Sequence, residues 1–175
     1  MAEATVVRTD ASGNIFLAGT FQGAVDLAPD TGLWPVVSNG SRDVFVTKLN
    51  PDGSHAWTRT FGGAFEDSLE SLVVDSSGNL FVAGSFGMTV DFDPTSGVDN
   101  RTSVGIRDGF LLKLNADGSY GWVKTFGGTD AHTSVLGICR DSSGNLDLTG
   151  TFSKTVDFKP GAGTDTSTAA DGVFG

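Results

Sequence analysis

An all-β fold is predicted by three features of the 175-residue sequence: a repeated motif, many turn-forming glycines and short alternating apolar runs. Glycine supplies 25 of the residues, about twice its usual share of ~7%. The apolar runs have the length of strands, and Gly, Asp or Asn stands between them. These features together favour short strands joined by tight turns.

The repeated motif has a period of about 65 residues. Its copies are DASGNIFLAGTF, DSSGNLFVAGSF and DSSGNLDLTGTF, which begin at Asp10, Asp75 and Asp141. A second pair, DVFVTKLNPDGSHAWTRTFGG and DGFLLKLNADGSYGWVKTFGG, begins at Asp43 and Asp108. Self-similarity at a fixed period indicates stacked copies of one structural unit.

Each copy is expected to contain four strands, A to D. Strand A is the apolar run before the DxSGN motif, and strand B is the run after it, NIFLAGTF in the first copy. Strand C is VFVTKLN or FLLKLN, and strand D is AWTRTFGG or GWVKTFGG. The DxSGN and N-x-DGS segments are tight hairpins, in which glycine supplies a positive φ. The long B–C connection carries a VDF-like segment and is expected to hold a short extra strand.

These units predict a β-propeller of four-stranded blades of about 65 residues, with about two and a half blades in the chain. The first blade spans residues 1–63, the second 64–128, and an incomplete third 129–175. The third copy lacks most of strand C and all of strand D, which would leave apolar blade faces uncovered. We therefore expect either the missing blades of a longer chain or a closed homo-oligomer, most simply a dimer.

The segments GNLFVAGSF, VDFDP, DGFLLKLNADGS and W-x-KTFGG resemble the bacterial β-propeller repeat family known as SBBP. The resemblance covers nearly the whole chain. It implies a propeller fold, usually in large secreted or surface proteins, and hence an extracellular or cell-surface location. It implies no single activity. The N-terminal segment has no apolar signal-peptide core, and no apolar run is long enough to span a membrane.

The formal charge of −10 comes from 21 Asp and Glu against 11 Lys and Arg. A surface of this charge repels phosphate backbones and anionic membranes, so neither nucleic acid nor membrane insertion is expected. The acidity suits cation binding or simple solubility, and solubility is the simpler explanation.

Propeller geometry places the D–A and B–C connections on one face, the usual ligand face. Four candidate binding residues fall in D–A connections: Glu66, Asp67, Asp130 and His132. Four candidate metal ligands fall in B–C connections: Asp26, Asp91, Asp93 and Asp157. The opposite face carries the hairpins, beside which His55 is expected to be exposed.

Calcium is the first candidate cofactor, because it binds carboxylate and carbonyl oxygens and Asp91 lies close to Asp93. The alternative is that Asp26, Asp91 and Asp157 orient the insertion through hydrogen bonds to the backbone. A second candidate is zinc or another divalent transition metal, held by His132 with Asp130, whose bound water would hydrolyse an ester or phosphoester. The alternative there is an exposed loop histidine.

The remaining distinctive side chains have structural interpretations. Trp57 and Trp122 recur in register and are expected to pack between blades, and Trp34 is expected to pack over the insertion. Cys139 lies in an apolar run and is expected to be a small core residue. The sequence therefore predicts a non-catalytic propeller scaffold that binds protein, glycan or calcium on an acidic face. The alternative is a metal-dependent hydrolase.

Overall fold

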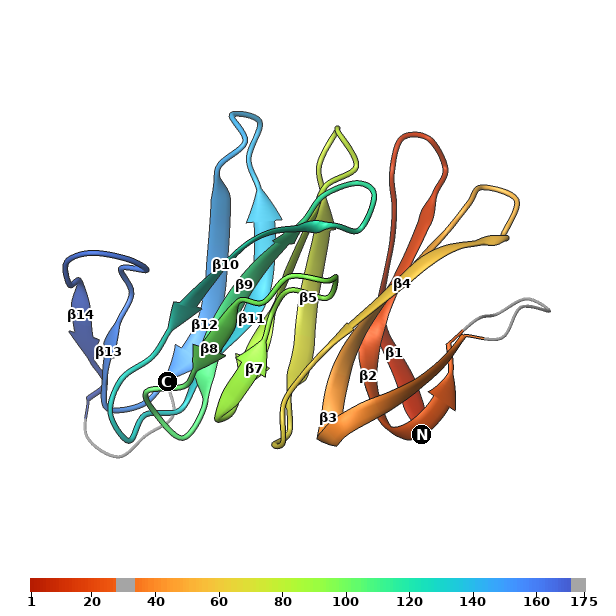
Figure 1. The fold of residues 1–175 in the computed structure, drawn as a ribbon. Coiled ribbons are helices and arrows are strands. Elements are labelled where there is room, and N and C mark those ends of the chain that lie inside the picture. Colours follow the sequence, from red (N-terminus) through yellow and green to blue (C-terminus); the bar gives the residue numbers. More distant parts are fainter. Residues whose placement is uncertain (28–33, 171–175) are drawn as a thin grey trace.

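The computed structural model describes residues 1–27 and 34–170, and every regular element in these residues is a β-strand (Figure 1). The all-β prediction is therefore confirmed. Residues 28–33 of the first B–C connection and residues 171–175, where strand C of the third copy was predicted to begin, lie outside the described residues. The described residues contain no helix long and apolar enough to cross a membrane.

The first two copies of the repeat each form a four-stranded antiparallel sheet. The first sheet has the order β1-β2-β3-β4, with the bounds Ala2–Thr9, Ile15–Asp26, Pro35–Leu49 and His55–Phe61. The second sheet has the order β10-β9-β6-β5 and contains β5 (Ser68–Val74), β6 (Leu80–Phe86), β9 (Asp108–Leu114) and β10 (Tyr120–Phe126). The third copy contributes β11 (Thr133–Arg140) and β12 (Leu146–Phe152), which pair with each other.

The B–C connection contains two short antiparallel strands, one more than the sequence predicted. They are β7 (Thr89–Asp91) with β8 (Asn100–Thr102) in the second copy, and β13 (Thr155–Asp157) with β14 (Thr166–Thr168) in the third. In the first copy the same pairing extends the long strands β2 and β3. We call each of these two-stranded units an insertion.

The predicted DxSGN hairpins form because the aspartate caps the turn. Asp75 Oδ1 accepts hydrogen bonds from the backbone N–H groups of Ser77 and Asn79, at 2.8 and 2.9 Å. Gly78 completes the turn with a φ of 81°, which a side chain would disfavour. The copies at Asp10 and Asp141 make the same bonds. In Figure 1 these turns stand at the top of the three sheets.

The sheets stack face to face through two apolar clusters. The first cluster joins Phe16 and Val46 of the first sheet to residues such as Leu72 and Leu112 of the second. The second cluster lies on the opposite face of the second sheet. There the buried residues Phe81, Ala83 and Leu111 contact Val135 and Ile138 of β11. Each copy is therefore fixed to the next by buried apolar area.

The structure confirms that Trp57 packs between successive sheets. Its side chain is only 9% exposed, and it belongs to the cluster between the first two sheets. The hairpin between β9 and β10 covers the indole: a Cβ built on Gly118 would lie 3.0 Å from two of the ring carbons. Trp122, its counterpart one repeat later, is half-buried against the second cluster.

The two free faces of the array carry polar residues at four positions where the stacked faces are apolar. On the first sheet, Thr47 and Thr58 replace the buried Leu112 and Val123 of the second, and their hydroxyl groups share a 2.8 Å hydrogen bond. On β12, Asp147 and Thr149 replace the buried Phe81 and Ala83 of β6.

Cys139 is exposed, so its assignment to the core is wrong. Its sulfur lies 3.8 Å from a carboxylate oxygen of Asp147, on the free face of the β11–β12 pair. The apolar run around Cys139 covers only one face of a strand, and the residue stands on the other face.

Candidate functional site

The carboxylates of the insertions hold the backbone of their own loops. Asp91 Oδ1 accepts hydrogen bonds from the N–H groups of Asp93 and Asp99, at 3.0 and 2.9 Å. Asp157 repeats this pattern with Lys159 and Asp165, both at 2.9 Å. Backbone donors from Asp165 and Lys159 lower the pKa of Asp157 below its usual value.

The first copy follows the same pattern, because Asp26 Oδ1 accepts the N–H of Trp34 at 2.9 Å. Asp93 is occupied as well: its Oδ1 accepts the N–H of Thr95 at 2.9 Å and also the hydroxyl of that residue. These bonds match the structural alternative stated for the insertion carboxylates. In the described part of the chain, no three His, Cys, Asp or Glu side chains come together as a metal ion would require. Calcium binding stays a prediction.

The insertions fold back toward the hairpins, so the expectation that they lie wholly on the connection face is wrong. Tyr120, directly after the hairpin between β9 and β10, donates a short hydrogen bond to Asp99 at the far end of the β7–β8 loop. One repeat earlier, the ring of Trp34 lies 5.2 Å from that of His55. His55 is half-buried and bonds to Thr58, so its predicted exposure is also wrong. Figure 1 shows the β13–β14 loop directed to the hairpin side.

On the connection face, Arg107 brings together residues from two D–A connections. Its Nη1 lies 3.6 Å from Glu66 Oε2, next to Asp67 in the connection between β4 and β5. Its carbonyl accepts the N–H of Thr133 at 3.0 Å, and its backbone forms an isolated bridge with His132. Sequence reasoning missed this arginine, although Arg42 stands 65 residues earlier, before the repeated aspartate.

Asp67 is buried beneath this surface, at 1% exposure. Its carboxylate accepts the N–H groups of Gly63 at 2.7 Å and Gly87 at 3.3 Å, which ties a D–A connection to the end of β6. Burial raises the pKa of Asp67 to about 6, against the opposing effect of these two hydrogen bonds. This buried carboxylate stabilises the D–A connection through its hydrogen bonds and is not accessible to a ligand.

Three polar atoms of this face are buried and unpartnered within the described residues: Nε and Nη2 of Arg107 and Oγ1 of Thr133. Both residues line a small hollow of about 90 Å³, together with His132, Ser85, Ser134, Thr151 and Phe152. Buried donors without acceptors cost free energy, so this is the least satisfied polar region of the connection face.

His132 and Asp130 lie at the rim of this region and are both exposed. Asp130 has a φ of 54°, in the left-handed turn that leads to His132. The backbone of His132 exchanges hydrogen bonds with Ser153: its N–H donates to Ser153 Oγ, and its carbonyl accepts the Ser153 N–H, both at 2.9 Å. No hydrogen bond or ion pair joins the side chains of Asp130 and His132 in the described structure. The zinc site therefore stays a prediction.

Exposed apolar side chains surround the charged residues of this face. Phe65 is 57% exposed, Ile106 56% and Met88 53%. The first two flank Gly87, where an added Cβ would lie 3.4 Å from Phe65 Cβ and 3.6 Å from the carbonyl of Ile106. Met88 is held at a φ of 57°, which is uncommon for a residue other than glycine. Aromatic side chains, methionine and arginine are enriched in protein-binding surfaces.

No family model matches the chain, so the resemblance to the SBBP repeats stays a prediction. The chain is 25% identical, over 189 aligned positions and 94% of its length, to an uncharacterized WD repeat-containing protein of Acanthamoeba polyphaga mimivirus. It is 28% identical, over 120 positions and 69% of its length, to the regulatory protein FlaEY of Caulobacter vibrioides. It spans only 14% and 12% of the length of these two relatives. The name of the viral relative agrees with a repeat protein.

Proposed function

We propose that the chain is a non-catalytic scaffold, a segment of a β-propeller that binds another protein on its connection face. The observation that carries this proposal is the stacking of successive sheets through continuous apolar clusters. Such stacking fixes the D–A connections side by side and so makes one rigid surface from separate copies. The WD-repeat name of the viral relative supports a scaffold of this class.

The contact surface in this proposal is formed by Phe65, Met88 and Ile106 around the pair of Arg107 and Glu66. Exposed aromatic and aliphatic side chains supply contact area, and an arginine beside them supplies directional hydrogen bonds. The acidic side chains of the insertions lie outside this surface and keep the chain soluble.

Metal analysis separates this proposal from the calcium-binding and hydrolase alternatives. We expect the purified chain to carry no stoichiometric metal, to melt at the same temperature with and without chelator, and to hydrolyse no ester or phosphoester. A transition metal that disappears in His132→Ala, together with hydrolysis, would contradict a non-catalytic function. A calcium-dependent rise in melting temperature, lost in Asp93→Asn, would add calcium binding to the scaffold.

A separate measurement tests how the propeller is closed into a ring. The sequence-based proposal is a dimer whose two chains complete one propeller, or a ring completed by further blades of a longer chain. Light scattering should give twice the mass of one chain if the dimer is correct. A mass of one chain at all concentrations contradicts the dimer.

A further inference from the structure

The outer edge of β12 has no partner strand within the described residues. Its counterparts are enclosed on both sides: β2 lies between β1 and β3, and β6 lies between β5 and β9. Among the described strands, β12 pairs only with β11. An unpaired edge presents a row of backbone N–H and C=O groups that another strand can bind.

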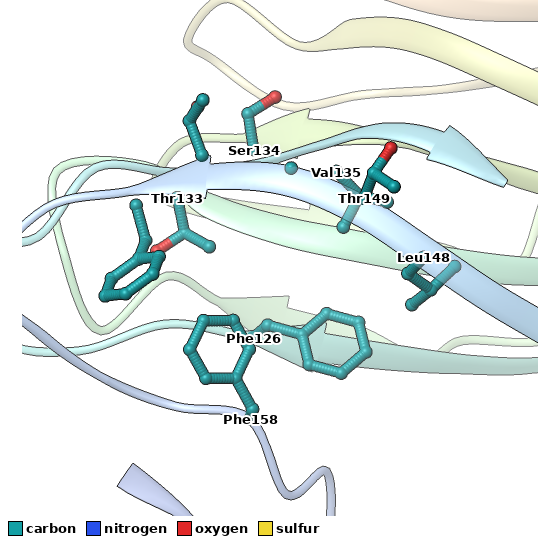
Figure 2. Close-up of a pocket in the computed structure, with 10 residues that line it drawn as sticks. Phe126, Thr133, Ser134, Val135, Leu148, Thr149 and Phe158 are labelled. Carbon is teal, nitrogen blue, oxygen red and sulfur yellow. The ribbon is translucent and has the colours of Figure 1, made fainter. Parts of the chain in front are cut away.

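An apolar groove of about 190 Å³ follows this edge. Its walls are Leu148 and Phe152 of β12, Val135 of β11, Phe126 at the end of β10, and Phe158 after β13. Figure 2 shows Phe126 and Phe158 on one side of this space, across from Leu148 and Thr133. The groove therefore has an apolar wall and a free hydrogen-bonding edge.

One repeat earlier, the same place is filled by a phenylalanine of strand C. Phe110 of β9 lies 5.7 Å from Phe61, 6.5 Å from Phe86 and 5.2 Å from Phe92, measured between ring centroids. Three of these four rings recur one repeat later as Phe126, Phe152 and Phe158. The pair Phe152–Phe158 keeps the 5.2 Å edge-to-face contact that corresponds to the 5.1 Å contact of Phe86 with Phe92. The counterpart of Phe110 in the sequence is Val173, which lies outside the described residues.

The hairpin that follows β9 has its own contacts with the preceding sheet. Its turn lies on the ring of Trp57, and Arg59 Nε donates to the carbonyl of Gly118 at 2.8 Å. Lys48 Nζ donates to the carbonyl of Ala116 at 3.3 Å. These contacts join the hairpin between strands C and D to the copy before it.

The three side chains that contact this hairpin, Trp57, Arg59 and Lys48, have counterparts on the second sheet. These are Trp122, Lys124 and Lys113. Trp122 is half-buried where Trp57 is buried, and Lys124 is exposed. In the described part of the chain, the structure gives neither lysine a hydrogen-bond acceptor. Within the described residues, the groove, the three phenylalanine rings and these three side chains are left without the hairpin that their counterparts hold one repeat earlier.

We propose that this groove binds a β-hairpin with the sequence of the repeat's own strands C and D. The first strand pairs antiparallel with β12 and places its phenylalanine between Phe126, Phe152 and Phe158. The Asn-x-Asp-Gly turn then lies on Trp122, and Lys113 and Lys124 donate to its carbonyl groups. This inference rests on the β9–β10 contacts and goes beyond the proposed contact surface around Arg107.

A synthetic peptide with the sequence of residues 106–128 tests the proposal on the isotopically labelled chain. We expect saturable binding, with slowed hydrogen exchange at alternate amides of β12 and a shift in the indole N–H signal of Trp122 in the labelled chain. Two control peptides remove one anchor each: Phe110→Ala leaves the space between the three phenylalanine rings unfilled, and Gly118→Val disfavours the turn at its φ of 79°. Each should weaken binding by about tenfold or more, as loss of a central anchor does.

A fused chain covers the case in which the free peptide does not form a hairpin. Here the sequence of residues 110–128 follows residue 172, where Asp171 and Gly172 repeat Asp108 and Gly109. We expect a higher melting temperature and protected β12 amides, and both effects should be lost when the appended strand carries the Phe110→Ala change.

Binding in either format that survives the Phe110→Ala change would overturn the proposal, as would a fused chain that melts and exchanges like the parent. Protection of β12 amides that grows with the concentration of the free chain would also overturn it, because a second copy would then cover the edge. The scaffold proposal is unaffected by these failures, because the first cluster, which joins the first two sheets, contains no residue of β11 or β12.

Discussion

Replacing Asp67 with Asn should remove most of the pH dependence of stability above about pH 4.5. The side chain is 1% exposed and accepts two backbone N–H groups, from Gly63 and Gly87. Burial raises its pKa from the usual 3.8 to about 6, although both hydrogen bonds oppose the shift. Asparagine keeps the size and one acceptor of the side chain but cannot ionise, so it isolates the charge.

The raised pKa means that the folded chain binds this proton more tightly than the unfolded chain does. Between pH 3.8 and about 6 the folded state retains a proton that the unfolded state has lost, so stability falls as pH rises. The shift corresponds to about 3 kcal/mol in full, of which about 2 kcal/mol lies above about pH 4.5. The carboxylates that cap turns, such as Asp75, have lowered pKa values and act mainly at lower pH.

Urea unfolding of both proteins at intervals from about pH 4.5 to about pH 7 measures the effect. We expect the parent free energy of unfolding to fall by about 2 kcal/mol and that of Asp67→Asn to fall much less. A small slope should remain, because burial also raises the pKa values of Asp43 and Asp108. Parallel profiles for the two proteins would refute the assignment of the pH dependence to Asp67.

Four further substitutions test packing and backbone strain, each by urea unfolding at neutral pH. Trp57→Ala should cost about 3–5 kcal/mol because the indole is buried, while Trp122→Ala should cost clearly less; equal losses would contradict the open groove. Met88→Gly should add about 0.5–1 kcal/mol by relieving a φ of 57°, as its counterpart Gly23 indicates, and a loss of stability would contradict this strain. Gly84→Ala should cost about 3 kcal/mol, because the new Cβ would lie 1.9 Å from the carbonyl oxygen of Ser68; a neutral effect would show that β5 adjusts.

The repeat made the secondary structure predictable because its determinants are local. Asp75 and Gly78 specify a hairpin through bonds within five residues, and the alternating apolar side chains specify which strand face is buried. The sequence also suggested that Asp91 orients the insertion through hydrogen bonds to the backbone. This could be foreseen because those bonds lie within its own loop. The stacking of Trp57 could be inferred because its recurrence in register implies a recurring environment.

The connection-face site was harder to predict because contacts between copies define it. Glu66 and His132 are far apart in sequence, and both contact Arg107. Apart from its recurrence in the repeat, nothing in the sequence distinguishes Arg107 from the other arginines. The burial of Asp67 depends on Gly87, at the end of another strand. The contact of Tyr120 with Asp99 likewise requires the insertion to fold back, and no local pattern encodes that direction.

The positions that break the repeat distinguish two kinds of uncovered surface. On the free faces, Thr58 and Asp147 stand where the stacked copies have Val123 and Phe81: Asp147 is exposed to solvent, and Thr58 is covered but hydrogen-bonded to Thr47. Terminal units of repeat arrays need such polar outer faces to stay soluble. The apolar wall of the groove beside β12 is retained: Phe152 keeps the aromatic residue of the stacked copy. The free faces carry polar replacements, whereas the groove keeps its aromatic residues. This difference favours binding of a hairpin at the β12 edge over binding of another sheet on the free faces.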